Sequence, residues 1–220
     1  SFLRNLSNGL RQMQKYQNQL SSGKEVSRPS DNPLLVGKIM SINNSIAQND
    51  QYNSNIGDAL GWVKTQDTAL ADATQTLQRI SDLIIHGSNG SLSELDRNAI
   101  VEEVETKIEQ LVDILNTNFD GRYIFAGQKT NNKPFDTGLV YNNYIDNLDG
   151  EDNNNLTREI SQGVVVKLIT DGSEIVGNPT GDDNLGELLA DVIKALKDGN
   201  SDELTGENGL LADVQKATDN

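Results

Sequence analysis

Histidine is the side chain that most often acts as a general base near neutral pH, and this chain of 220 residues has one, His86. His86 precedes Gly87 at the end of a predicted helix, where a histidine usually interacts with the terminal carbonyl groups. The chain has no cysteine, which excludes thiol nucleophiles, thiolate metal sites and disulfides. Its serines have no activating base. The sequence therefore predicts no catalytic residue, and we expect a protein that is not an enzyme.

Acidic residues gather around Gly150 in a pattern that partly matches a calcium-binding loop. With Gly150 as the sixth residue of such a loop, Ile145 and Leu156 stand at positions one and twelve, where acids are required. We therefore expect a solvated acidic loop, with no metal ligand and no cofactor. A glycan- or metal-binding module in this region is kept as an alternative, and its acidic residues are Asp146, Asp149, Glu151 and Asp152.

The net charge of −15 is spread unevenly. Residues 1–130 carry 15 acids and 12 bases, whereas residues 131–220 carry 18 acids and 6 bases. Nucleic-acid binding needs a concentrated basic face, which is missing here. A membrane helix needs about 20 consecutive apolar residues, and no such run is present. Neither nucleic acid nor a membrane is a predicted partner.

The first predicted helix carries one narrow apolar stripe. Its apolar residues follow the alternating three- and four-residue spacing that is typical of a coiled coil. No equally long stripe elsewhere in the chain is available to pair with it. Burying six such side chains, with Tyr16 counted as the sixth, contributes at most about 9–18 kcal/mol, so we expect a missing segment or another subunit to cover this interface. The predicted interface residues are Leu3, Leu6, Leu10, Met13 and Leu20.

A second helix is expected to begin at Pro33, with Asp31 or Asn32 as its cap. About 50 residues keep the same spacing, which corresponds to a helix of roughly 75 Å. Gly57 and Gly61 predict either a bend or the close approach of another helix. The stripe consists of Leu35, Ile39, Ile42, Ile46, Asn49, Asn53, Ile56, Leu60, Val63, Asp67, Leu70, Thr74 and Leu77, and continues to Ile84.

A third helix is expected to start at a capping box formed by Ser93 and Asp96. Its apolar residues run from Val101 to Leu115 in the same spacing. The turn at residues 86–90 makes the second and third helices an antiparallel hairpin. We expect residues 35–115 to pack mainly on themselves.

The pattern changes to short β-prone runs after Gly121, and helical spacing returns at Leu185. The β-prone runs are 123–125, 139–141, 163–169 and 174–176. The predicted fold is mainly α with a small β-rich insertion, built as an elongated rod of long antiparallel helices. The expected divisions are residues 1–31, an N-terminal helix and linker; 32–130, a helical rod; 131–183, a β-rich region; and 184–220, a helical return into the rod.

Two segments resemble a known family. LSSGKEVSRPSDNP, residues 20–33, resembles the N-terminal signature of the flagellin superfamily through Arg28, Pro29, Ser30, Asp31 and Pro33. NTNFDGRYIFAGQKT, residues 116–130, is similar to the hook–filament junction branch of that superfamily rather than to filament flagellin. The residues that carry this second similarity are Asn116, Thr117, Gly121, Arg122, Tyr123, Phe125 and Gly127.

The resemblance implies a structural subunit of the bacterial flagellum with an inner polymerisation domain, a helical domain and an outer β domain. It implies an adaptor that joins the hook, through hook-associated protein 1, to the flagellin filament and self-associates in a ring. It also implies release from the cell through the flagellar type III export apparatus, assisted by a chaperone, and hence an extracellular location. The family's long C-terminal helix is absent from this sequence, so residues 1–31 are expected to lack their usual partner helix. Filament flagellin is the nearest alternative.

Overall fold

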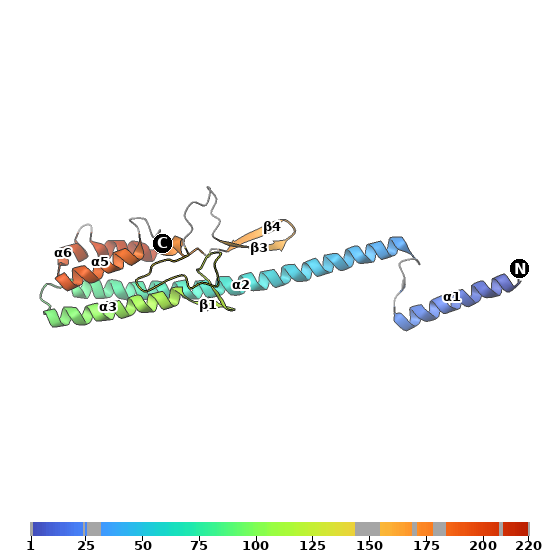
Figure 1. Cartoon of the computed structure of the whole chain (residues 1–220), viewed down its shortest axis with the longest axis horizontal. Helices are drawn as coiled ribbons and strands as arrows, with labels where there is room; N and C mark the ends of the chain where they lie inside the picture. Colours follow the sequence, from blue (N-terminus) through green and yellow to red (C-terminus); the bar gives the residue numbers. More distant parts are fainter. Residues whose placement is uncertain are drawn as a thin grey trace. The chain divides into compact units, whose positions relative to one another are not determined.

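The computed structural model describes residues 2–23, 25, 32–143, 155–168, 171–177, 184–206 and 209–219. Two compact units divide the chain, Ser1–Ser54 and Asn55–Asn220. The described part is mainly helical, with two separate two-stranded sheets (Figure 1). The predicted fold class, mainly α with a small β-rich insertion, is confirmed.

The first unit contains helix α1 (Phe2–Ser22) and the beginning of helix α2 (Pro33–Gly87). Helix α2 begins at Pro33 as predicted. The Asn32 side chain accepts a hydrogen bond from the Leu35 amide at 3.1 Å, and the Asn32 carbonyl accepts one from the Val36 amide at 3.0 Å. Asn32 is therefore a cap of α2. Asp31, the other candidate, lies outside the described residues.

Helix α2 is continuous through Gly57 and Gly61. A Cβ atom at Gly61 would lie 2.7 Å from Cζ of Phe119, whereas one at Gly57 would have no neighbour within 4 Å. A close approach is thus present at Gly61, but it is made by the Phe119 ring rather than by another helix as predicted.

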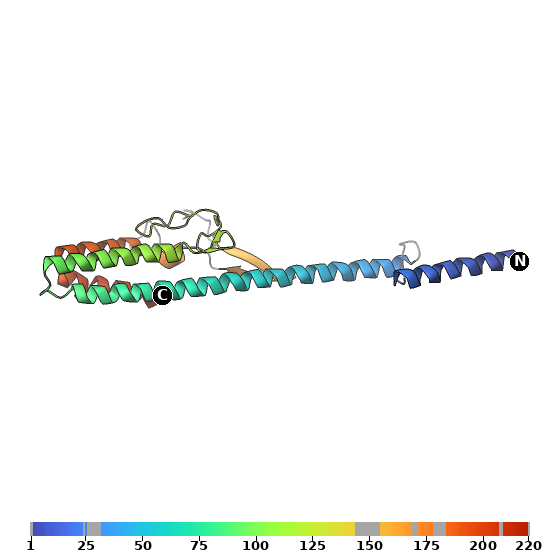
Figure 2. The same ribbon diagram turned by 90° about the horizontal axis from the view of Figure 1, so that it is seen from below.

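The second unit is built around one apolar core. The C-terminal part of α2 runs beside α3 (Glu94–Leu115), and α5 (Leu185–Asp198), α6 (Ser201–Thr205) and α7 (Leu210–Asp219) pack on them (Figures 1 and 2). The predicted α2–α3 hairpin is thus present. The largest fully buried side chains of these helices are Ile80, Ile84, Val104, Leu111, Leu115, Leu189, Leu196 and Leu204.

Local hydrogen bonds set the ends of these helices. The Ser93 hydroxyl accepts a bond from the Asp96 amide at 3.2 Å, so Ser93 caps α3 as predicted. The Asp96 carboxylate accepts from the Ser93 hydroxyl at 2.7 Å, rather than from the Ser93 amide as in a full capping box. Asn184 caps α5 by accepting from the Gly186 amide at 2.8 Å. Gly199 ends α5 in the left-handed conformation, with φ of 68°.

The buried face of α2 differs from the predicted stripe. Leu77 and Ile84 are buried as expected, but Leu60 and Val63 are 65% and 49% exposed. The core instead receives a neighbouring face that includes Trp62, Gln66, Ala69 and Ala73. The middle of α2 therefore packs within the chain as expected, but not through the predicted stripe, because the neighbouring segments meet a face shifted by one residue, about 100° around the helix.

The first sheet pairs strands β1 (Asn118–Phe119) and β2 (Arg122–Tyr123) in antiparallel register. Its two-residue turn consists of Asp120 and Gly121, both with positive φ, 51° and 78°. Asp-Gly in a two-residue hairpin favours this turn, because its twist matches that of the flanking strands. Tyr123 is the only residue of the predicted run 123–125 that lies in a named strand of the described part.

The second sheet pairs β3 (Leu156–Ser161) with β4 (Val164–Leu168), also antiparallel. Strand β4 confirms most of the predicted run at 163–169. The run at 139–141 forms a single bridge, between Phe135 and Tyr141. The strand predicted at 174–176 is wrong: α4 (Ser173–Val176) is a helical turn, started by the Asp171 side chain accepting from the Ser173 amide at 3.1 Å.

The region after β2 contributes to the helical core. Phe135, Leu139, Tyr141, Leu168 and Val176 are each at most 2% exposed and belong to the same apolar cluster as the helices. The rings of Phe135 and Tyr141 lie 5.3 Å apart between centroids. These contacts hold the β hairpins close to α2, which matters for the pocket described below.

Candidate functional site

The predicted interface residues of α1 form an exposed apolar stripe, hereafter the α1 stripe. Their exposed fractions are 78% for Leu3, 51% for Leu6, 59% for Leu10, 70% for Met13 and 86% for Leu20. Helix α1 contains no buried residue. An apolar stripe of this spacing and exposure is suited to packing against another helix.

Helix α2 also exposes apolar residues at the predicted stripe positions, hereafter the α2 stripe. In the first unit these are Ile39, Ile42 and Ile46, at 41%, 50% and 53%. In the second unit they are Ile56, Leu60, Val63 and Leu70, at 38%, 65%, 49% and 40%. Sequence reasoning identified these residues but assigned them to packing within the chain.

The first signature segment is mostly outside the described part of the chain. The residues outside it include Arg28, Pro29, Ser30 and Asp31. Pro33 is the first residue of α2, where its missing amide hydrogen removes no helical bond. The described geometry of this segment is therefore that of a helix start.

The second signature segment begins with a residue that connects two distant stretches of backbone. The Asn116 side chain donates to the Phe135 carbonyl and accepts from the Phe135 amide, both at 3.0 Å. Asn116 also follows the last residue of α3 as its cap. One amide side chain thus ends a helix and fixes the segment that places Phe135 in the core.

The next residues of the segment shape the first hairpin. The Thr117 hydroxyl donates to the Ile114 carbonyl at 2.6 Å, and the Thr117 carbonyl accepts from the Ile124 amide at 3.2 Å. The Gly121 amide donates to the Asn118 side chain at 2.8 Å. Thr117 and Gly121 therefore support the backbone rather than present reactive groups.

The end of the segment is buried or held by backbone bonds. The Tyr123 amide donates to the Thr130 carbonyl at 2.8 Å, Phe125 is 1% exposed, and Gly127 has a φ of 62°. The fold brings the signature residues from Asn116 to Gly127 together. Most of them build the junction between the α2–α3 hairpin and the first sheet.

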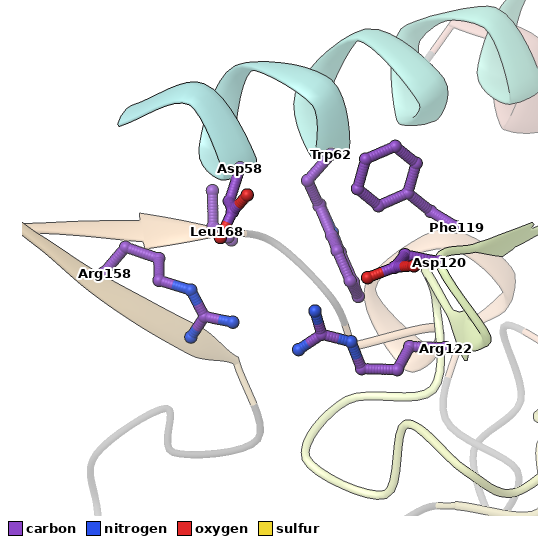
Figure 3. A pocket seen from close by; sticks show the side chains of 7 residues that line it. All are labelled: Asp58, Trp62, Phe119, Asp120, Arg122, Arg158 and Leu168. Carbon is purple, nitrogen blue, oxygen red and sulfur yellow. The ribbon is translucent and has the colours of Figure 1, made fainter. Parts of the chain in front are cut away.

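Arg122 lines a cavity of about 430 Å³, together with Phe119 and Asp120 of the same segment. Its guanidinium carbon lies 5.8 Å from the centroid of the Trp62 ring, and the Trp62 and Phe119 rings meet edge to face at 6.0 Å. Figure 3 shows Arg158 of β3 across the cavity from Arg122. The lining residues are Asp58, Trp62, Phe119, Asp120, Arg122, Arg158 and Leu168.

Sequence reasoning missed this pocket. Its residues come from α2 and both hairpins, and 100 positions separate Asp58 from Arg158 in the chain. Trp62 is the only tryptophan, which was the one signal available in the sequence.

The described residues were considered as metal ligands and as membrane-spanning helices. Within the described ranges, no three His, Asp or Glu side chains are grouped so that they could hold a metal ion. The acidic residues from Asp146 to Asp152 lie outside those ranges. None of the described helices combines the length and the apolar character that a membrane crossing requires.

The family of the bacterial flagellin N-terminal helical region matches residues 1–130, and the chain belongs to this family. Flagellar hook-associated protein 3 of Escherichia coli strain K12 is 34% identical over 134 residues, which cover 60% of this chain and 42% of that protein. The chain thus spans about two-fifths of the length of the curated relatives it matches. These findings confirm the resemblance that the two signature segments indicate.

Solved structures resemble the chain as well. The crystal structure of FlgL from Xanthomonas campestris has a TM-score of 0.53 and 28% identity, covering 61% of this chain and 42% of that one. The flagellar hook associated protein-3 from Legionella pneumophila has a TM-score of 0.66, covering 82% of this chain and 87% of the other. At 16% identity, this second likeness concerns the fold alone.

Proposed function

Because the chain belongs to the bacterial flagellin family, we propose that it is a structural subunit that joins the flagellar hook to the filament. The similarity to flagellar hook-associated protein 3 and to FlgL supports this branch of the family. The adjacent partners are then hook-associated protein 1 on one side and flagellin on the other, with further copies of the chain completing a ring.

The α1 stripe is the observation that carries the proposal. Each of its five residues is more than half exposed on a helix without buried residues. Covering a leucine or methionine side chain contributes about 1.5–3 kcal/mol, so a partner helix of matching spacing would stabilise α1 considerably. This burial in the assembled flagellum is the role that we assign to Leu3, Leu6, Leu10, Met13 and Leu20.

The α2 stripe extends the same argument. Its exposed isoleucines in the first unit repeat the spacing of the α1 stripe. We assign residues 1–31 to an inner polymerisation domain, 32–130 to a helical domain, 131–183 to an outward-facing β-rich region and 184–220 to the helical return. In this arrangement the two stripes face neighbouring helices, and the acidic residues of 131–220 face solvent.

The chain acts by packing rather than by catalysis. We propose that it leaves the cell through the flagellar type III export apparatus with a dedicated chaperone and works outside the cell, in the flagellum. The absence of cysteine is compatible with passage in an unfolded form, since no disulfide must form or open.

The test is deletion of the full-length gene in the source bacterium, followed by electron microscopy and complementation. We expect hooks without attached filaments and flagellin released into the medium. Immunogold labelling of complemented cells is expected at a short zone between hook and filament. Attached filaments of normal number in the deleted strain would contradict the proposal.

Filament flagellin is the second candidate, because the first signature segment and the matched family region are common to the whole family. Labelling along the full length of the filament would favour this candidate over the junction.

A further inference from the structure

We propose that the pocket between α2 and the two hairpins binds the carboxylate of an aspartate or glutamate side chain presented by another protein segment. Two half-buried arginines, Arg122 and Arg158, reach this pocket from different strands. Figure 3 shows their guanidinium groups pointing toward one another across the cavity. Like charges that face each other in a partly enclosed space are best accommodated when an anion lies between them.

Within the described ranges, both guanidinium groups keep hydrogen-bond donors without a protein acceptor. Among the described residues, neither arginine forms an ion pair. The hydrogen bond found for Arg158 is to the Thr157 carbonyl, at 3.1 Å. Arg122 is held by its contact with the face of Trp62, which leaves the edge of its guanidinium available. Two such forks suit the planar, two-oxygen geometry of a carboxylate.

Trp62 also lines the cavity. It is 2% exposed, and its indole Nε1 has no hydrogen-bond partner in the described part of the chain. Its ring supports the Arg122 guanidinium, and the donors that a ligand can reach are those of the two arginines.

The rim of the pocket selects among anions. Asp58 and Asp120 are exposed and line the same cavity. Their negative charges repel a doubly charged phosphate more strongly than a singly charged carboxylate. They can accept bonds from backbone amides beside a carboxylate side chain. An acidic sugar is disfavoured because the Trp62 face is covered by Arg122, so no exposed tryptophan platform is available for a sugar ring.

The experiment uses Trp62 fluorescence of the full chain, which reports on this pocket alone because Trp62 is the only tryptophan. The probe is acetyl-alanyl-glutamyl-alanine amide, and the control probe is its glutamine analogue, both at constant ionic strength. We expect a saturable change in Trp62 fluorescence with the glutamyl peptide. The affinity for the glutamine peptide should be about tenfold lower. Equal responses to the two peptides would overturn the proposal.

Variants assign the response to the pocket. Arg158→Gln is expected to lower the affinity for the glutamyl peptide about tenfold, and Arg122→Gln should lower it by a similar factor. Arg158→Lys keeps the charge but loses the two-pronged guanidinium geometry. Its affinity should therefore lie between those of the unchanged chain and Arg158→Gln. The matched control is Arg79→Gln, because Arg79 is paired with Glu103 on α3 outside the pocket. An unchanged midpoint in Arg158→Gln, with an unchanged thermal transition, would refute the assignment.

Three small anions separate the sources of the charge. Acetate, inorganic phosphate and glucuronate are titrated in the same way. A tighter midpoint for the glutamyl peptide than for all three supports a protein side chain. A midpoint concentration for acetate or phosphate as low as that for the glutamyl peptide indicates a free anion. A lower midpoint for glucuronate indicates a sugar acid. Each of these results would overturn the proposal. The titration is done in solution, so it does not depend on whether the chain joins hook to filament.

Discussion

At the scale of single residues, glycine and asparagine in this chain act through backbone geometry. Gly61 admits the Phe119 ring against α2, and Asn116 bonds to both polar groups of the Phe135 backbone. Asp120 and Gly121 turn the first hairpin with positive φ.

Gly57 and Gly61 are predicted to respond differently to alanine. Gly57→Ala should raise the free energy of unfolding by about 0.5–1 kcal/mol, because it gains helix propensity in open space. Gly61→Ala should be about 1–3 kcal/mol less stable than Gly57→Ala, because its Cβ displaces Phe119. Urea unfolding measures both. Equal effects of the two substitutions would show that Phe119 does not press on the helix.

Asn116→Ala is predicted to lower the free energy of unfolding by about 2–4 kcal/mol, because the amide and carbonyl of the buried Phe135 lose their partners. The control is Asn98→Ala, the same change on the exposed face of α3, which should be neutral or slightly stabilising. Thermal and urea unfolding give the comparison. A loss below about 0.5 kcal/mol for Asn116→Ala would contradict this role.

At the scale of elements, α1 and α2 differ in how much of their apolar surface the chain itself covers. Helix α1 has none of its stripe buried, whereas the C-terminal part of α2 contributes Ile80 and Ile84 to the core. The α2 stripe lies between these extremes. Exposed apolar stripes of this kind are suited to packing against other helices, and this is the role that we propose for the α1 stripe in assembly.

Leu10→Asp should separate assembly from folding. Leu10 is 59% exposed, so its replacement should change the free energy of unfolding by no more than about 0.5 kcal/mol. The same change in the full-length gene should abolish filament attachment, because a charge cannot be buried in a helix seam.

The matched control for this change is Gln12→Asp, which places the same charge about 200° around α1. Gln12 is exposed, and cells carrying this variant should keep their filaments. Filament counts by electron microscopy and unfolding by circular dichroism provide the two readouts. Normal filaments with Leu10→Asp would remove the α1 stripe from the assembly surface.

At the scale of the whole molecule, the two units differ in internal support. The residues of the apolar core, from Trp62 to Val214, all belong to the second unit, Asn55–Asn220. In the first unit no residue of α1 is buried. Segments with few buried contacts open locally at low free-energy cost.

Limited trypsin digestion of the full chain should therefore begin in the first unit. We expect the earliest cuts after Arg4, Arg11, Lys15 or Lys38 rather than after Arg97 or Lys107 of α3. Mass spectrometry of a time course identifies the order of cleavage. Early cleavage after Arg97 would contradict the assignment of the stable core to the second unit.

The sequence alone predicted those features that depend on residues close together in the chain. Three of these features follow from spacing and capping within about four residues. They are the start of α2 at Pro33, the cap at Ser93 and Asp96, and the narrow stripe of α1. The two signature segments identified the family, because they are continuous in the chain.

Only the tertiary structure decided which apolar face of α2 is buried and which side chains meet. Periodicity shows that a helix has apolar faces, but not which of them a partner helix covers, so Trp62 and Ala69 are buried while Leu60 and Val63 are not. Asn116 and Phe135 are 19 residues apart, and Arg122 and Arg158 lie on separate hairpins. Such contacts depend on the path of the whole chain, which local propensity does not determine.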